Sequence, residues 1–267
     1  MAEDYMHGHH SSVVSSHARR TAENSVAYLL PHLTPGMALL DVGCGPGTIT
    51  VDLAERLAPG RVVGVDTSDV ALQLAREVAE HRGAAVTFRV GDAYALAAEA
   101  GDYDVVHAHQ VLHHLTRPVD AIREFGRVAG AAGLVALREV DYGGIVWWPD
   151  VPELEEWLDL FLRIGRALGG EPSAGRRLLA WAHEAGVTVE EAGASVWSYA
   201  TAEDRAWFAD SWAQRATESD FARHAVELGF ADRDRLERIA EGWRTWAAAA
   251  DGWLAMPHGE VLARGIG

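Results

Sequence analysis

Short apolar stretches alternate with longer amphipathic stretches between residues 38 and 139. The short stretches are rich in valine and leucine, as buried strands are, and the longer ones repeat their apolar positions at helical spacing. We therefore expect strands at residues 38–42, 61–66, 86–90, 103–108 and 133–139, and helices at 48–57, 70–82 and 119–128. Strands that alternate with helices of this length predict βαβ units around a parallel sheet.

The segments on either side of this alternation show different patterns. Before it, apolar positions at helical spacing predict a helix over residues 11–30, which Pro31 ends. After Asp141 we expect helices at 152–168 and 175–185, a helical stretch at 201–250, and strands at 187–199 and 253–264. Pro257–Gly259 predicts a bulge or bend in the last of these strands.

Composition and charge exclude several classes of protein. The chain has 267 residues, of which 49% are apolar, and this is enough for a large core. Its formal charge of −16 repels phosphate backbones, so we expect no nucleic-acid partner. No apolar run is long enough to span a membrane, and the N-terminal segment lacks the apolar centre of a signal peptide. Because Cys44 is the single cysteine and cannot form an internal disulfide, we expect a cytoplasmic protein.

A glycine-rich turn follows the first predicted strand and leads into a helix. It spans Asp41–Thr48 and has glycine at alternate positions, where the backbone turns sharply and a ligand can approach it closely. Asp66 ends the second strand and Asp92 follows the third, where carboxylates can accept hydrogen bonds from ribose hydroxyls and from an adenine amino group. The spacing of the glycines is neither that of a dinucleotide fold nor that of a P-loop. By itself the turn is compatible with a dinucleotide, with another nucleoside or with no ligand.

Five segments taken together resemble one family. In chain order they are Asp41–Gly47, Val63–Asp66, Gly91–Ala93, Tyr103–Val106 and Val111–Leu115. The first four resemble motifs of the class I S-adenosylmethionine-dependent methyltransferases. The last, which is Val-Leu-His-His-Leu, is similar to the small-molecule branch that includes quinone C-methyltransferases.

This resemblance implies a fold class and a domain organisation. The fold is α/β and Rossmann-like, with a seven-stranded, mostly parallel sheet whose last strand is antiparallel and with helical lid insertions. One methyltransferase domain then covers residues 1–267. Its expected parts are an N-terminal lid helix within residues 1–34, a cofactor-binding core at 35–141, and substrate-capping helical insertions at 142–172 and 201–250.

The resemblance also implies S-adenosyl-L-methionine as cofactor and S-adenosyl-L-homocysteine as product. Asp66 is expected to hold the ribose and Asp92 the adenine, while the glycine turn holds the methionine part, in which Cys44 fills space. His109 and Gln110, at the end of the fourth strand, are expected beside the methyl-bearing sulfur. The full set of expected cofactor-binding residues is Arg20, Asp41, Gly43, Cys44, Gly45, Gly47, Thr48, Asp66, Thr67, Ser68, Gly91, Asp92, Ala93, His109 and Gln110.

Three charged side chains near this site have alternative interpretations. Arg20 shares a face of the predicted N-terminal helix with His17, and it either pairs with the cofactor carboxylate or stays solvated beside Glu23. Glu139 and Asp141 end the fifth strand. They either face the substrate or cap neighbouring backbone groups, and the second alternative is the favoured one.

Tyr5, His10 and His113 are the candidate catalytic residues. A histidine exchanges its proton near neutral pH and can act as a base if the acceptor must lose a proton. The alternatives are that His113, with its neighbour His114, only fixes local hydrogen bonds, and that Tyr5 and His10 belong to a polar terminus. We expect no metal, because the histidines lack accompanying zinc-ligand spacings.

These observations together predict methyl transfer to a small, aromatic or heterocyclic metabolite, as in natural-product biosynthesis. All ten tryptophans follow residue 146, in the part expected to shape the acceptor site, where aromatic rings suit a flat, apolar molecule. Transfer to carbon is slightly favoured by the resemblance, and transfer to oxygen or nitrogen remains an alternative. A cofactor-bound cyclase without methyl transfer and an NAD-dependent oxidoreductase are the rival functions. The expected partner is a small-molecule acceptor, not a membrane, and the sequence leaves open whether the chain forms a homodimer.

Overall fold

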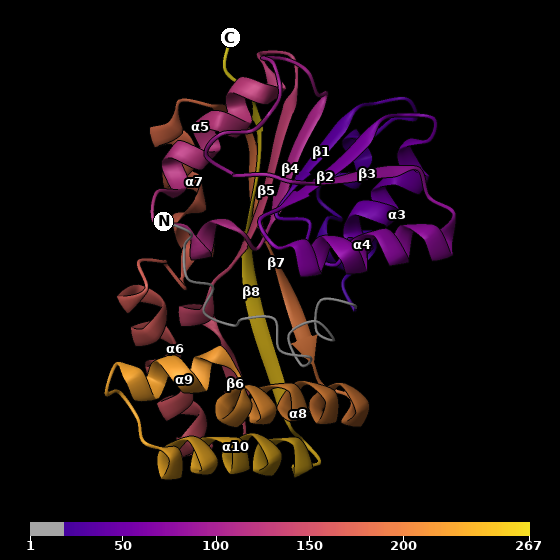
Figure 1. The fold of residues 1–267 in the computed structure, drawn as a ribbon. Coiled ribbons are helices and arrows are strands. Elements are labelled where there is room, and N and C mark those ends of the chain that lie inside the picture. Colours follow the sequence, from indigo (N-terminus) through magenta and orange to yellow (C-terminus); the bar gives the residue numbers. More distant parts are fainter. Residues whose placement is uncertain (1–18) are drawn as a thin grey trace.

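Five parallel strands form one half of a central sheet, as Figure 1 shows for the described residues 19–267 of the computed structural model. These strands are β1 (Leu39–Val42), β2 (Val62–Asp66), β3 (Val86–Val90), β4 (Val105–His109) and β5 (Leu134–Val140). They lie in the order β3-β2-β1-β4-β5. All five are close to where the sequence predicts strands, and every residue of β1, β4 and β5 is buried, as in a parallel sheet that is covered on both faces.

Three further strands, which are joined to the sheet by antiparallel pairing through the last of them, complete it to eight strands. They are β6 (Val146–Trp148), β7 (Thr188–Tyr199) and β8 (Trp253–Arg264). One side of β8 pairs with β7, and the other side pairs first with β6 and then with β5. The sequence predicts β7 and β8 but not β6, because β6 has three residues that are mostly exposed and gains its pairing only from a distant part of the chain.

The bulge predicted at Pro257–Gly259 is wrong. The pairing of β7 with β8 continues without a shift from Leu254 to Val261, and the irregularity lies instead on β7, between Val189 and Glu191. Pro257 is tolerated because β8 changes neighbours there, from β6 up to Ala255 to β5 from His258 onward. No strand needs a backbone N–H from the proline at this point.

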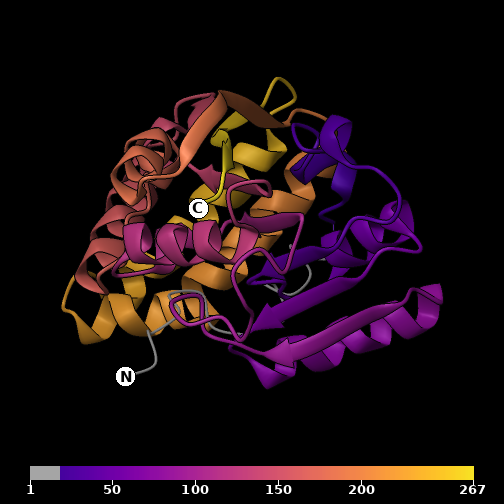
Figure 2. The same cartoon turned by 90° about the horizontal axis from the view of Figure 1, so that it is seen from above.

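Helices cover both faces of the sheet. They are α3 (Thr48–Leu57), α4 (Asp69–Arg82), α5 (Pro118–Ala129) and α7 (Leu178–Ala185), with a short 3-10 turn η4 (Ala174–Arg177) before the last. The apolar sides of α5 and α7 pack on one face, and α3 packs on the other. Seen from above, the indigo and purple elements of the first half gather on one side of the molecule (Figure 2).

A separate cluster of helices lies beyond one end of β7 and β8 (Figure 1). Its members are α6 (Pro152–Ala167), α8 (Ala202–Glu218), α9 (Asp220–Glu227) and α10 (Arg233–Ala248). The helical stretch predicted at 201–250 is interrupted twice, at Ser219, which caps α9, and at Gly229, which has a φ of 66°. Trp157, Trp212 and Trp243 form the centre of the cluster and are at most 1% exposed. No helix of residues 19–267 is long and apolar enough to cross a membrane.

The N-terminal helix predicted at 11–30 is wrong in the part that the structure describes. There the chain forms only α2 (Ala22–Ser25) and a 3-10 turn, η1 (Leu30–His32). Thr21 and Asn24 form a capping box, and the backbone oxygen of Asn24 accepts a hydrogen bond of 2.7 Å from the indole of Trp197. The capping side chains and a distant tryptophan therefore occupy backbone N–H and C=O groups that a longer helix would need for its own hydrogen bonds. Residues 11–18 lie outside the described part.

Candidate active site

The glycine turn after β1 depends on glycine for two reasons. Gly43, Gly45 and Gly47 have φ values of 70°, 53° and 78°, which disfavour other residues. A Cβ atom on Gly43 would lie 2.4 Å from Cγ2 of Val111, and one on Gly47 would lie 2.7 Å from Cβ of Ala75. The turn is therefore tight and presents backbone at the point between β1 and β4 where the strand order reverses, which is where open α/β sheets bind ligands.

Asp41 supports this turn from beneath. Its side chain is 4% exposed, and its two oxygens accept hydrogen bonds from Nδ1 of His107 at 2.7 Å and from Oγ1 of Thr50 at 2.5 Å. The sequence predicts that Asp41 binds the cofactor. In the structure both carboxylate oxygens are hydrogen-bonded to protein side chains. Asp41 therefore holds the glycine turn in position.

Two carboxylates lie at the carboxyl ends of β2 and β3. Asp66 accepts hydrogen bonds from the backbone nitrogens of Gly45 at 3.0 Å and Ser68 at 2.9 Å, so it connects the glycine turn to the start of α4. The backbone nitrogen of Gly91 donates to the backbone oxygen of Asp66 at 3.1 Å, which brings the two strand ends together. Asp92 follows directly and is exposed. The structure thus brings both predicted carboxylates to one edge of the sheet, beside the turn.

The remaining residues predicted along this edge have smaller roles in the structure. Thr48 begins α3, and Ser68 caps α4 through a hydrogen bond from the backbone nitrogen of Ala71. Thr67 is exposed and Ala93 is half-buried. Burial raises the pKa of the Cys44 thiol, so this side chain stays a neutral space-filler.

Arg20, Gln110 and His258 form a hydrogen-bonded chain beside the end of β4. Nη2 of Arg20 donates to Oε1 of Gln110 at 2.7 Å, and Nε2 of Gln110 lies 2.8 Å from Nε2 of His258. Nδ1 of His258 lies 3.1 Å from the backbone oxygen of Met256, which can only accept, so His258 carries its proton there. Its Nε2 therefore accepts from the Gln110 amide, and every member of the chain has one defined orientation.

The surroundings of Arg20 differ from the sequence prediction. Arg20 precedes α2 and is not part of a helix, and His17 lies outside the described residues. Glu23, the alternative partner, pairs with Arg56 at 3.3 Å. The guanidinium of Arg20 instead lies 5.7 Å from the ring centre of Trp197.

His109 lies at the end of β4 and is 6% exposed. Its ring lies 5.8 Å from the ring of Trp197, and none of the described residues offers a hydrogen bond to either ring nitrogen. Burial, followed by the charges of Arg20 and Arg138, lowers its pKa well below the usual value. His109 is therefore a neutral imidazole at the edge of the site.

Glu139 organises the segment that follows β4. Its buried carboxylate accepts hydrogen bonds from the backbone nitrogens of Val111 and Leu112 and lies 2.8 Å from Nδ1 of His113. Burial raises the pKa of Glu139 to about 7 and lowers that of His113 to about 3. Glu139 thus caps backbone groups, as the favoured alternative has it, whereas Asp141 forms an ion pair with Arg176.

Of the three catalytic candidates, His113 lies among the described residues. His113 is 3% exposed, and its ring lies 3.7 Å from that of His114. In this geometry its contacts are local ones that hold the segment after β4. Tyr5 and His10 lie outside the described residues. Residues 19–267 contain no cluster of three or more side chains that could hold a metal ion.

A small hollow, part of it open to solvent, lies between the end of β4 and α8. Most of its wall is aromatic. The lining residues are Arg20, Gln110, Tyr142, Trp197, Tyr199, Trp207, Phe208, Ser211, Trp212, Arg215 and Met256. Gln110 precedes Val111, which touches Gly43, so the cavity and the glycine turn meet at this point. Sequence reasoning missed Ser211 and Arg215, although Trp207, Ser211 and Arg215 repeat at a spacing of four along α8.

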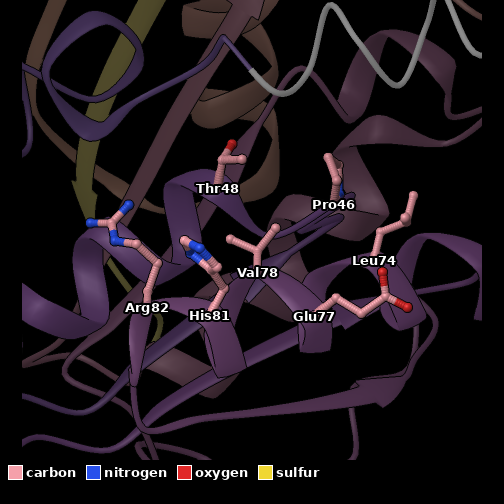
Figure 3. Close-up of a pocket in the computed structure, with 7 residues that line it drawn as sticks. All are labelled: Pro46, Thr48, Leu74, Glu77, Val78, His81 and Arg82. Carbon is pink, nitrogen blue, oxygen red and sulfur yellow. The ribbon is translucent and has the colours of Figure 1, made fainter.

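A larger and more open hollow lies beside the glycine turn (Figure 3). Its wall consists of Pro46 and Thr48 from the turn and of a stripe of α4 that includes Glu77, Val78 and His81. Neither strand-end carboxylate lines it. We therefore place the candidate active site at the strand ends and the aromatic cavity.

Comparisons with known proteins show the family to which the chain belongs. A family described as a methyltransferase domain matches residues 33–168. An uncharacterised methyltransferase of Schizosaccharomyces pombe is 33% identical over 97% of this chain and 95% of its own length. The chain belongs to the class I S-adenosylmethionine-dependent methyltransferases.

Two solved structures share the fold of this methyltransferase. A provisionally assigned methyltransferase from Bacillus halodurans C-125 has a TM-score of 0.60 at 17% identity and covers 91% of this chain and 99% of its own. A cyclase named SpnF has a TM-score of 0.53 at 22% identity and covers 96% of this chain and 80% of its own. At these identities the likeness concerns the fold.

The residues of this methyltransferase fit S-adenosylmethionine. The glycine turn leaves backbone close to the strand ends, and Asp66 and Asp92 place two carboxylates beside it at neighbouring strand ends. Hydroxyls of a ribose and an amino group of adenine are the donors that such carboxylates accept from. The same edge lacks the lysine of a P-loop, so it does not suit a chain of phosphates.

Proposed function

We propose that this methyltransferase transfers a methyl group from S-adenosylmethionine to a small aromatic or heterocyclic molecule. The products are the methylated acceptor and S-adenosylhomocysteine. The observation that carries the proposal is the meeting, at Gln110, of a strand-end site with two carboxylates and a cavity with aromatic walls. Carbon is the favoured acceptor atom, from the resemblance of Val111–Leu115 to quinone C-methyltransferases.

Each part of the cofactor has a proposed partner. Asp66 accepts hydrogen bonds from the ribose, and Asp92 accepts one from the adenine. The turn from Gly43 to Gly47 holds the methionine part, and Arg20 pairs with its carboxylate. When bound, the cofactor supplies an electrophilic methyl group. The protein then contributes mainly position and the exclusion of water.

The aromatic walls of the cavity support a flat acceptor. Rings of Trp197, Trp207 and Trp212 contribute to the wall, and Tyr199 stacks on Phe208 with ring centres 4.1 Å apart. Flat, apolar molecules gain the most from such surfaces. In this proposal α8 and the other helices of residues 201–250, with residues 142–172, cap the acceptor, and residues 35–141 hold the cofactor.

The rival function is a cyclase that uses the same fold without methyl transfer, and the likeness to SpnF makes it a necessary comparison. Calorimetry with S-adenosylhomocysteine and NADH tests the cofactor first. Binding of S-adenosylhomocysteine without binding of NADH supports the proposal, and the opposite result removes it. Transfer of labelled methyl to an extractable product then separates a methyltransferase from a cyclase.

A further inference from the structure

Residues 19–24 form a strap that contacts both the helix beside the aromatic cavity and the helix that follows the glycine turn. On the cavity side, the guanidinium of Arg19 lies 4.6 Å from the ring centre of Trp207 in α8. On the other side, the backbone nitrogen of Ala22 donates a hydrogen bond of 2.8 Å to the carboxylate of Asp52 in α3. The strap therefore connects the acceptor side of the proposed site to its cofactor side.

Trp197 of β7 is bound to the strap at two residues. Its indole nitrogen donates a hydrogen bond of 2.7 Å to the backbone oxygen of Asn24. The guanidinium of Arg20 lies 5.7 Å from the centre of the same ring, and it also donates to Gln110 at the end of β4. A cation at this distance is attracted to the face of an indole. Because Trp197 also lines the aromatic cavity, one side chain of the acceptor wall holds the strap where the two halves of the site meet.

The sheet holds the indole of Trp197 in place. Its ring centre lies 4.4 Å from that of His258 and 4.8 Å from the guanidinium of Arg138. Arg138 is buried and donates hydrogen bonds of 3.0 Å to the side chains of Ser195 and Glu260. These side chains belong to β5, β7 and β8. The direction of the indole N–H bond is therefore set by the sheet and not by the strap.

We infer that Trp197 is a positioning residue that controls how long the cofactor stays bound. Its indole N–H keeps the strap closed, and the closed strap keeps Arg20 beside Gln110. The inference rests on the proposed function, which places the cofactor against the strap through Arg20. A cofactor held by the strap leaves only after the strap lifts. A side chain on the acceptor side of the site therefore sets the rate at which the cofactor leaves.

The probe is labelled S-adenosylhomocysteine, whose dissociation is followed while an excess of unlabelled compound prevents rebinding. Trp197→Phe keeps an aromatic ring at the same place and removes the hydrogen bond to Asn24. We expect the compound to leave this variant about fivefold faster, which is the change that the loss of one hydrogen bond produces. The association rate should stay the same or rise, because a strap that lifts more easily does not hinder entry.

Trp148→Phe is the matched control. It makes the same exchange on β6, where the indole nitrogen of Trp148 donates a hydrogen bond of 2.9 Å to Asp251, which is not part of the strap. This variant should release S-adenosylhomocysteine at the rate of the wild type.

Asp52→Ala tests the strap from its other side, because it removes the carboxylate that accepts from the backbone nitrogen of Ala22. It should also speed dissociation. Asp52 pairs with Arg82 as well, at 3.2 Å, so a second control is needed. Glu55→Ala removes another partner of Arg82 but keeps the bond between Ala22 and Asp52, and it should leave the dissociation rate unchanged.

Urea unfolding shows whether each variant is folded. An unchanged dissociation rate in Trp197→Phe, a slower association in that variant, or an equal rise in Trp148→Phe overturns the inference while leaving the proposed function in place. If Trp197→Phe does not fold, the comparison of Asp52→Ala with Glu55→Ala decides in its place. Failure of the wild-type protein to bind S-adenosylhomocysteine instead overturns the proposed function, and the inference with it.

Discussion

The side-chain nitrogen Nε2 of Gln110 donates to Nε2 of His258 over 2.8 Å. This hydrogen bond connects the segment after β4 to β8, the strand that pairs with β5, β6 and β7. Gln110 is the one non-glycine residue with a positive φ, 55°, among residues 19–267. A backbone in this conformation persists only where its surroundings hold it, so the His258 contact has a positioning role at the point where the two halves of the site meet.

Replacing His258 by Phe should lower the rate of methyl transfer. The variant keeps the ring but removes the acceptor for Gln110, and even a small misplacement of groups beside the reaction reduces the rate. We expect kcat to fall about tenfold, with little change in the affinity for S-adenosylhomocysteine. His183→Phe, at an exposed position of α7, is the control. Unchanged kcat in His258→Phe would show that Gln110 needs no support from β8.

Asp66→Ala should weaken cofactor binding. The carboxylate would hold the ribose and also accepts from the backbone nitrogen of Gly45, so its loss removes a ligand contact and loosens the turn. Loss of charged hydrogen bonds predicts a Kd for S-adenosylhomocysteine at least about tenfold higher by calorimetry. Asp69→Asn changes an exposed carboxylate three residues later and should leave the Kd unchanged. Equal Kd values for Asp66→Ala and wild type would refute the assignment.

Gly43→Ala should destabilise the fold more than Gly83→Ala does. Both glycines have positive φ, 70° and 63°, so both substitutions carry a backbone cost of about 1 kcal/mol or more. Only at Gly43 would the new Cβ collide, at 2.4 Å from Val111, whereas nothing lies within 4 Å at Gly83. Such a collision adds about 1–3 kcal/mol. Urea unfolding of both variants measures the difference, and equal losses would mean that Val111 moves aside freely.

Acid should destabilise the protein through its buried histidines. Burial lowers the pKa of His109, His113, His114 and His258 below the usual 6.5, so the unfolded chain binds more protons than the folded one as the pH falls through 6.5. The contribution of these imidazoles to the free energy of unfolding is therefore fully present above pH 6.5 and is lost progressively below it. At pH 5.5 each imidazole accounts for about 1.4 kcal/mol.

Glu139 opposes this effect over part of the same range. Its pKa is raised to about 7, so the folded protein gains protons there before the unfolded one does. We expect a net loss of stability between pH 7.5 and 5.5 in urea unfolding, smaller than the sum over the four imidazoles. His113→Asn should make the loss smaller still. Equal stability of the wild type at both pH values would contradict the burial of neutral imidazoles.

The cofactor half of the site follows from local sequence. The positions of Gly43, Asp66 and Asp92 are set by short strands and tight turns, whose patterns are visible within a few residues. The strands β2 and β3 and the helices α3 and α4 accordingly fall within a residue of the predicted ranges. The strands β7 and β8 were also predictable as elements, at residues 187–199 and 253–264, whereas their pairing joins distant parts of the chain.

The acceptor half depends on contacts between distant parts of the chain. The predicted helix over 11–30 breaks where Trp197 binds the backbone of Asn24, and Arg20 is oriented by Gln110. Nothing near Gln110 in the sequence points to His258. In the sequence Arg215 cannot be told from any other arginine of a helix, and only the packing of α8 shows that it lines the cavity. Such side chains acquire their roles only from tertiary structure, which local patterns do not contain.

The central claim is that this protein transfers a methyl group from S-adenosylmethionine to a small planar molecule. The most direct measurement incubates it with methyl-labelled S-adenosylmethionine and a panel of planar phenols and enols. It then counts label in extracted products and measures S-adenosylhomocysteine in the same reaction. We predict label in at least one product, in equal amount to S-adenosylhomocysteine, and a strong reduction with Asp66→Ala. Tight binding of S-adenosylhomocysteine without label in any product would contradict methyl transfer and favour a cyclase.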